Sequence, residues 1–287
     1  MAVAEITAPA RTTQSGFGFR HDLRAVRVVW QREMIRFSRD RMRIITSLLQ
    51  PLLFLFVLGS GLSRLASPGT HGVDLRTFVY PGVLAMAVMF TAIFSAASIV
   101  WDREFGFLRE MLVAPVRRGS IVLGKCFGGA TVAGFQGVLV MALAPLVHVP
   151  YSFAMIVEVL ALQLLLAFMI TAFGVMAAVQ ISQMQAFMAL MQMVVMPLLF
   201  LSGALFPLTG LPHWLAVLNR LDPLTYAVNP IRTAVFNHLD LTPAATAALL
   251  PGITWFGWQV PIAVQVGVVG ACAIAALGVA IAQFKRA

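Results

Sequence analysis

Residues 80–100 read YPGVLAMAVMFTAIFSAASIV, a run without a single charged side chain. A bilayer core of ~30 Å needs about 20 such residues in an α-helix, because only a helix or a closed barrel pairs its own backbone groups in lipid. Five further apolar runs of comparable length predict spans at 44–61, 121–147, 153–179, 186–206 and 260–283. The predicted fold is therefore an all-α integral membrane protein, with a tail and helix at 1–43 and a six-span domain at 44–287.

Composition and charge agree with six spans. The chain is 60% hydrophobic and 11% charged, whereas a soluble domain carries about 25% charged residues. Nine of the twenty Lys and Arg residues precede the first span, five lie at 103–125 and two in the tail, while loops 62–79 and 207–259 hold two each. By the positive-inside rule both termini are expected in the cytoplasm. This topology accounts for the net charge of +9, so no nucleic-acid partner is predicted.

Residues 119–126, GSIVLGKC, have the G-x-x-x-x-G-K spacing of a phosphate-binding loop. A working loop follows a strand and opens a helix in a soluble domain, and Cys126 offers a thiol where Mg²⁺ prefers oxygen. We therefore expect no ATP site on this chain. Lys125 is expected to extend toward the headgroups, and Gly124, Gly128 and Gly129 to permit close helix packing. No metal site is predicted, since the histidines lack the short ligand spacing of zinc sites.

Two amphipathic segments flank the first spans. In 21–43, HDLRAVRVVWQREMIRFSRDRMR, an apolar stripe with Trp30 and Phe37 lies opposite arginines, which predicts a helix in the headgroup layer. A calmodulin-target or nucleic-acid helix has the same pattern. In 101–118, WDREFGFLREMLVAPVRR, apolar residues recur at helical spacing until Pro115. That helix would rest on lipid or in a groove of another protein.

Two segments carry a family resemblance. Residues 103–125, REFGFLREMLVAPVRRGSIVLGK, resemble the cytoplasmic loop of the type-2 ATP-binding-cassette (ABC) exporter permeases. Residues 201–232, LSGALFPLTGLPHWLAVLNRLDPLTYAVNPIR, are similar to the outer loop between the fifth and sixth spans of that family. The resemblance implies that two permease subunits, expected to be identical, pair with two nucleotide-binding subunits. Mg-ATP would bind the partner, so this chain would be no enzyme and would hold no cofactor.

The resemblance also implies roles for particular residues. A coupling helix at about 102–115 would transmit the motion of the ATPase, and a loop helix without a partner is the alternative. Its residues are Arg103, Glu104, Phe105, Gly106, Leu108, Leu112 and Pro115. The interface helix resembles the N-terminal helix of the family, with Trp30, Arg32, Arg36 and Phe37 as its key residues.

The outer loop at 207–259 is rich in proline. Helices are expected to start near Pro212, at Asp222–Pro223 and at Asn229–Pro230, because an N-cap followed by proline is a helix start. The resemblance implies that they are re-entrant and close the outer end of the pathway, and helices lying on the outer surface are the alternative. The residues assigned to this region are Pro207, Trp214, Asp222, Pro223, Tyr226 and Pro230.

Polar and methionine-rich helix faces are the candidate pathway. Methionine adapts to varied apolar shapes, and amides or hydroxyls in lipid need a partner helix or water. The candidates are Thr91, Ser95, Ser98, Met184, Gln185, Met188 and Gln192. Ordinary packing and interhelical hydrogen bonds are the alternatives.

The expected function is export of a lipophilic drug, as in multidrug resistance, a lipid or a lipid-linked polysaccharide across a bacterial plasma (inner) membrane. An integral-membrane enzyme and an ATP-independent secondary transporter remain the rival functions. The sequence leaves open the cargo and the identity of the ATPase partner.

Overall fold

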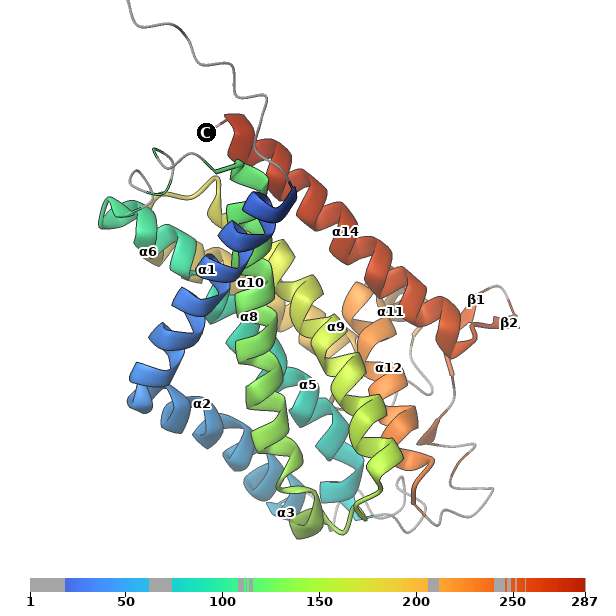
Figure 1. Ribbon diagram of the computed structural model, residues 1–287. Helices are drawn as coiled ribbons and strands as arrows, with labels where there is room; N and C mark the ends of the chain where they lie inside the picture. Colours follow the sequence, from blue (N-terminus) through green and yellow to red (C-terminus); the bar gives the residue numbers. More distant parts are fainter. Residues whose placement is uncertain are drawn as a thin grey trace, which may run out of the picture.

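The computed structural model describes residues 19–61, 74–107, 111, 113, 116–205, 212–239, 246, 249–250, 252–255 and 257–286. Over these residues the chain is a helical bundle with one short hairpin, in which each strand has two residues (Figure 1). The first part comprises α1 (Phe19–Arg39), α2 (Arg41–Leu53), a π-helical turn (Phe54–Leu58), α3 (Gly59–Gly61), α5 (Leu75–Ala96), α6 (Ser98–Glu104) and α8 (Arg118–Met141). The second comprises a 3₁₀ turn (Ala144–Val147), α9 (Phe153–Ala178), α10 (Met184–Leu201), α11 (His213–Leu221), α12 (Pro223–Phe236), strands β1 (Thr254–Trp255) and β2 (Trp258–Gln259), and α14 (Ile262–Arg286).

The predicted membrane fold is confirmed. Six helical segments among the described residues are long and apolar enough to span a bilayer: Ile44–Gly61, Leu75–Glu104, Arg118–Met141, Phe153–Ala178, Met184–Leu201 and Ile262–Arg286. The third ends earlier than predicted, at Met141 rather than 147. Pro145 lies in a 3₁₀ turn there, and the turn closes at His148 with a left-handed φ of 59°.

Helix α5 is the centre of the bundle. In the most apolar 18-residue stretch of the span Leu75–Glu104, 89% is buried inside the bundle. Helix α5 packs against α8, α9, α12 and α2. By contrast, the corresponding stretches of α10 and α14 are only 22% and 17% buried. Much of the apolar surface of these two helices is therefore left for lipid or for another protein.

The close helix packing predicted at Gly124 and Gly128 is present, and its partner is α1. A Cβ at Gly124 would lie 2.6 Å from Cβ of Val29, and one at Gly128 would lie 2.8 Å from Cβ of Glu33. Both distances are shorter than real Cβ contacts, so only glycine permits this approach. Gly124 and Gly128 thus serve packing within the chain.

The segment after α10 contains two of the three predicted helix starts. Helix α11 begins just after Pro212, and Asp222 caps α12 by accepting a hydrogen bond from the Leu224 N–H at 2.8 Å, with Pro223 as the first helical residue. The predicted start at Asn229–Pro230 is wrong, because α12 continues through Pro230 to Phe236. A proline inside a helix costs about 3 kcal/mol. The burial of α12 against α5, α9 and α14 outweighs that cost.

Candidate functional site

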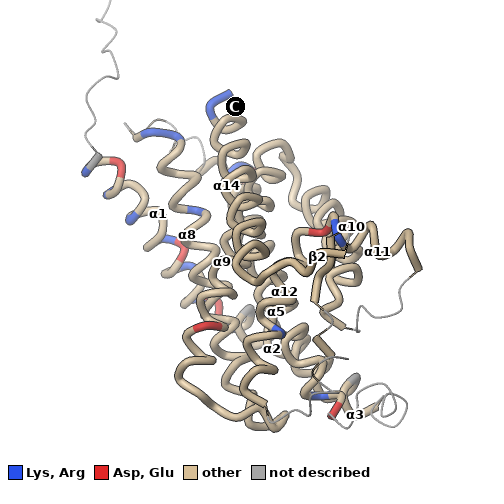
Figure 2. The backbone as a smooth tube through the Cα atoms, turned by 90° about the vertical axis from the view of Figure 1, so that its right-hand side faces the viewer, with Lys and Arg blue, Asp and Glu red and all other residues tan. Residues whose placement is uncertain are grey.

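Lys and Arg residues gather at one end of the bundle, where α8 begins and α14 ends (Figure 2). We call this the basic end. Helix α1 packs along α8 up to this end (Figure 1). Charged residues from three of these helices meet just inside the basic end.

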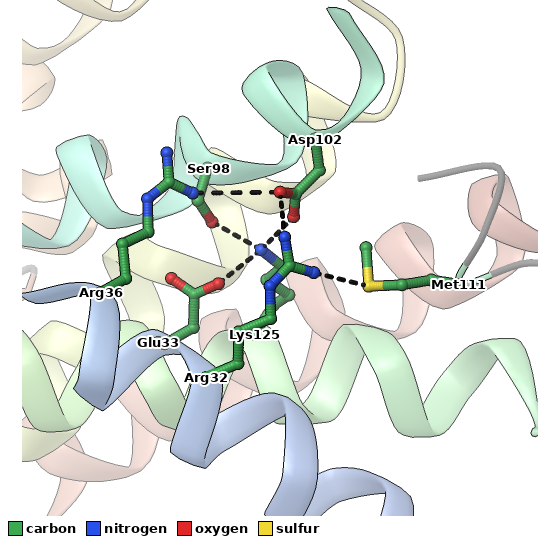
Figure 3. Close-up of polar contacts among 7 residues, drawn as sticks. All are labelled: Arg32, Glu33, Arg36, Ser98, Asp102, Met111 and Lys125. Atoms are coloured by element: carbon green, nitrogen blue, oxygen red, sulfur yellow. Dashed lines mark hydrogen bonds and ion pairs between the residues drawn. The ribbon is translucent and has the colours of Figure 1, made fainter. Parts of the chain in front are cut away.

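Lys125 is the centre of this charged cluster. Its Nζ lies 2.5 Å from Glu33 Oε1, 2.5 Å from Asp102 Oδ2 and 2.9 Å from Ser98 Oγ (Figure 3). The four residues come from α1, α6 and α8, and each is at most 4% exposed. We call Lys125, Glu33, Asp102 and Ser98 the buried ionic cluster.

The prediction that Lys125 reaches the headgroups is wrong. A buried charge needs opposite charges and hydrogen bonds around it, and the carboxylates of Glu33 and Asp102 supply them from neighbouring helices. The sequence held a signal for this contact. Glu33 lies three residues after Trp30 and four before Phe37, so an acid interrupts the apolar stripe of α1.

Two arginines extend the cluster toward its surface. Arg32 Nη2 donates to Asp102 Oδ1 at 2.7 Å and its Nη1 lies 3.2 Å from Met111 Sδ (Figure 3). Arg36 lies 3.9 Å from Asp102 Oδ1 and 4.7 Å above the centroid of the Trp101 ring. Both side chains point toward α6, and they remain 39% and 33% exposed, so their assignment to the headgroup layer stays a prediction.

The apolar stripe of α1 also faces inward. Trp30 Nε1 donates to Thr131 Oγ1 on α8 at 3.1 Å, and Phe37 is buried in edge-to-face contact with Phe135. Phe37 therefore packs inside the bundle and not in lipid as expected, whereas Trp30 remains partly exposed. The exposed apolar residues of α1 are Leu23, Val28 and Ile35.

The end of α6 connects four helices through three consecutive residues. Asp102 binds the side chains from α1 and α8. Arg103 donates to the Val179 and Ile181 carbonyls, at 2.8 and 3.1 Å, just after α9. Glu104 Oε1 accepts a hydrogen bond of 2.7 Å from the backbone N–H of Met184, the first residue of α10. We call residues 102–104 the α6 junction.

The segment after this junction differs from the continuous helix predicted at 102–115. Helix α6 ends at Glu104, and Gly106 has a left-handed φ of 79°, a conformation that glycine adopts without a Cβ penalty. Phe105 and Val113 are 72% and 86% exposed. Leu108, Leu112 and Pro115, also predicted in the coupling element, lie outside the described residues.

The pathway candidates divide between a cavity and the packed interior. A cavity of about 480 Å³ lies between α2, α5 and α10, and Thr91, Met184 and Met188 line it. A neighbouring cavity of about 170 Å³ is lined by Met188 and Gln192. The larger cavity is also lined by Gln50, Phe90, Phe94, Trp101, Thr46 and Ser47.

The other candidates lie elsewhere. Ser98 belongs to the buried ionic cluster, so for this residue the alternative of interhelical hydrogen bonding is confirmed. Ser95 is buried at the contact of α5 with Gly129 of α8. Gln185 is exposed and is not among the residues that line either cavity.

Of the outer-loop candidates, Asp222 and Tyr226 are buried, and Tyr226 donates through its hydroxyl to the Arg220 carbonyl at 2.7 Å. Trp214 is 64% exposed. Pro207 lies outside the part of the chain that the structure describes.

Comparison with known proteins places this architecture in a family. Residues 24–236 match the model of the ABC-2 type transporter family. The chain is 32% identical to the putative transport permease ycf38 of Cyanophora paradoxa over 210 residues, which is 71% of this chain and 72% of that protein. It is 28% identical to the inner membrane transport permease YadH of Escherichia coli K12, over 79% of this chain and 88% of YadH.

A third relative is nodulation protein J of Rhizobium leguminosarum bv. trifolii, 28% identical over 73% of this chain and 80% of that protein. The family match begins at residue 24, within α1, and extends through α12, so it includes the buried ionic cluster and the α6 junction. Members of the family generally work with an ABC ATPase subunit. The chain belongs to the ABC-2 type transporter family and is a membrane-spanning transport permease.

Proposed function

We propose that this chain is the permease subunit of an ABC exporter, which moves a lipophilic compound outward while a separate subunit hydrolyses ATP. Two permease chains, expected to be identical, would pair with two nucleotide-binding subunits that hold Mg-ATP. The basic end would face the cytoplasm of a bacterium, in agreement with the positive-inside rule. The relative YadH is named as an inner membrane permease, which supports the plasma membrane as the location.

The α6 junction is the observation that carries this proposal. Asp102, Arg103 and Glu104 contact α1, α8, the end of α9 and the start of α10, so a push on this junction reaches four helices. The exposed side chains of Phe105 and Phe107 follow directly, and Val113 is exposed further along the chain. Exposed apolar groups rimmed by charged residues are typical of a protein interface. A nucleotide-binding subunit docked there would act on the junction.

The cavity beside α10 supports a lipophilic cargo. Its volume of about 480 Å³ falls within the range of about 300–1,000 Å³ typical of small-molecule sites. Phe90 and Phe94 line it from α5, Met184 and Met188 from α10, and Thr46 and Ser47 from α2. This combination suits an amphiphile with an apolar body and a few polar groups. A drug-like compound or a lipid fits it better than a polysaccharide.

In the proposed mechanism, closure of the two ATPase subunits moves the segment after Glu104, and the α6 junction passes this motion to the helices around the cavity. The cavity then opens between two permease chains toward the outer side. The outer helices α11 and α12 would act as the re-entrant closure at that side. Asn219 supports this arrangement, because its Nδ2 binds the Leu201 carbonyl at the end of α10.

Affinity purification from native membranes tests the proposal. We expect the tagged chain to capture an ABC ATPase subunit in stoichiometric amount, and Phe105→Asp to lose it, because a charge then replaces an exposed apolar contact. Phe153→Asp is the matched control, since Phe153 is 84% exposed at the start of α9, away from the basic end. Capture that is equal for both variants, or the absence of any ATPase with the unaltered chain, would contradict the proposal.

A further inference from the structure

Helix α10 has little lateral packing. Its buried side chains form one narrow stripe along the helix, with a spacing of four residues: Phe187, Met191, Val195 and Leu199. The opposite face includes Met193, which is 75% exposed. Lateral contacts therefore hold α10 less firmly than they hold α5 or α8, whose most apolar stretches are 89% and 72% buried.

Polar side chains from other helices hold both ends of α10. At its end, the Leu201 carbonyl accepts from Asn219 Nδ2, and the Gly203 carbonyl accepts from Arg232 Nη2. Both donors are buried, with exposures of 6% and 3%. At its start, the Met184 N–H donates to Glu104 of the α6 junction at 2.7 Å. The helix is therefore fixed at two points and loosely packed between them.

Glu104 acts as the cap of α10, although it lies on α6 and is distant in the sequence. The first N–H groups of a helix have no partner within the helix, and a carboxylate there also interacts favourably with the helix dipole. The N-cap residue of α10, Gln183, makes no capping hydrogen bond with its side chain. Instead the acceptor comes from α6, two residues after Asp102, which the buried ionic cluster holds in place.

We propose that Glu104 is a positioning residue that moves α10 together with the end of α6. A shift of the segment after Phe105 would then displace the first turns of α10, with Met184 and Met188. The hydrogen bonds from Asn219 and Arg232 would meanwhile keep the far end of α10 in place. Because Met184 and Met188 line the larger cavity, this tilt would change the access to it. This inference rests on the proposed function and names the residue that connects the ATPase side to the cavity wall.

The test follows the reactivity of a cysteine at the cavity wall. Met188→Cys is introduced into a chain in which Cys126 and Cys272 are replaced by alanine, and the chain is purified with its ATPase subunit. The labelling rate with N-ethylmaleimide is measured without nucleotide and with Mg-ATP. We expect the rate to change on addition of Mg-ATP, and Glu104→Ala to abolish this change. Glu104→Gln, which keeps an acceptor oxygen, should retain most of it.

A double variant separates a coupling role from a merely structural cap. Gln183→Asp places a capping carboxylate on α10 itself, so Glu104→Ala with Gln183→Asp restores the cap without the connection to α6. We expect this double variant to assemble with the ATPase and still to lose the change in labelling. If Glu104→Ala alone does not assemble, the double variant supplies the measurement. Asp74→Ala is the matched control, since Asp74 caps α5 and should not affect the change.

Two results would overturn the inference and leave the proposed function standing. One is a nucleotide-dependent change that survives in Glu104→Ala, and the other is its recovery in the double variant. If the unaltered Glu104 chain itself shows no nucleotide-dependent change, the inference fails together with the mechanism proposed above.

Discussion

Replacement of Lys125 by methionine should destabilise the protein strongly. Methionine has a similar length and no charge, so the change removes the cation and leaves Glu33 and Asp102 in the interior. Removal of one partner from a buried ion pair costs about 3–5 kcal/mol. Asp102 keeps Arg32 at 2.7 Å, whereas the ion pair that the structure shows for Glu33 is the one with Lys125. The main loss of stability should therefore come from the carboxylate of Glu33, which stays buried after its cation is removed.

Thermal unfolding of the detergent-purified chain measures this cost. At roughly 2–4 °C per kcal/mol for a chain of this size class, about 3–5 kcal/mol corresponds to a drop in Tm of roughly 6–20 °C. Lys285→Met is the matched control. Lys285 is the other lysine of the chain and is exposed near the end of α14, so its loss should change stability by less than about 0.5 kcal/mol.

A double-mutant cycle identifies the source of the cost. If Glu33 is stranded in Lys125→Met, then Glu33→Gln should destabilise that variant less than it destabilises the unaltered chain. We expect a coupling energy of about 1–3 kcal/mol, as for residues in one charged network. A Tm of Lys125→Met equal to that of Lys285→Met would refute the buried ionic cluster and would agree with a lysine that extends to the headgroups.

Two further substitutions test the joints at the other end of the bundle, each by the same Tm measurement. Gly82→Ala should cost about 1–3 kcal/mol, because the new Cβ would overlap the carbonyl group of Ala204. In the control, Gly267→Ala, the new Cβ meets no atom within 4 Å, so this variant should be nearly neutral. Equal Tm values for the two variants would contradict the close contact of Gly82 with Ala204. Asp222→Ala should cost about 1 kcal/mol through loss of the α12 cap to Leu224, and Asp222→Asn should cost less; an unchanged Tm in Asp222→Ala would show that this cap contributes nothing.

The fold could be predicted because its cause is local in the sequence. Each span is a continuous apolar run, and the need to pair backbone groups in lipid leaves a helix as the structure for such a run. The start of α12 could be predicted for a similar reason, since Asp222 and Pro223 carry the cap and the first helical residue in two adjacent positions.

The site could be predicted only in part because its contacts are distant in the sequence. Lys125 lies 92 residues from Glu33 and 23 from Asp102, and nothing local identifies these partners. Pro230 has the sequence of a helix start, yet the packing of α12 against three helices overrides it. Gly106 is a residue in the sequence that favours a helix end at this point. The apolar periodicity of 101–118 continues past Gly106 and therefore predicted one continuous helix.

The position of Phe105 offers the most direct test of the central claim, that an ABC ATPase subunit docks at the basic end. A photoreactive amino acid is placed at Phe105 or at Phe153, the cells are irradiated, and the crosslinked proteins are identified by mass spectrometry. We predict that the residue at position 105 crosslinks to an ABC ATPase subunit and that the one at position 153 does not. Crosslinks from position 105 to lipid alone, or to the ATPase from position 153, would contradict this account.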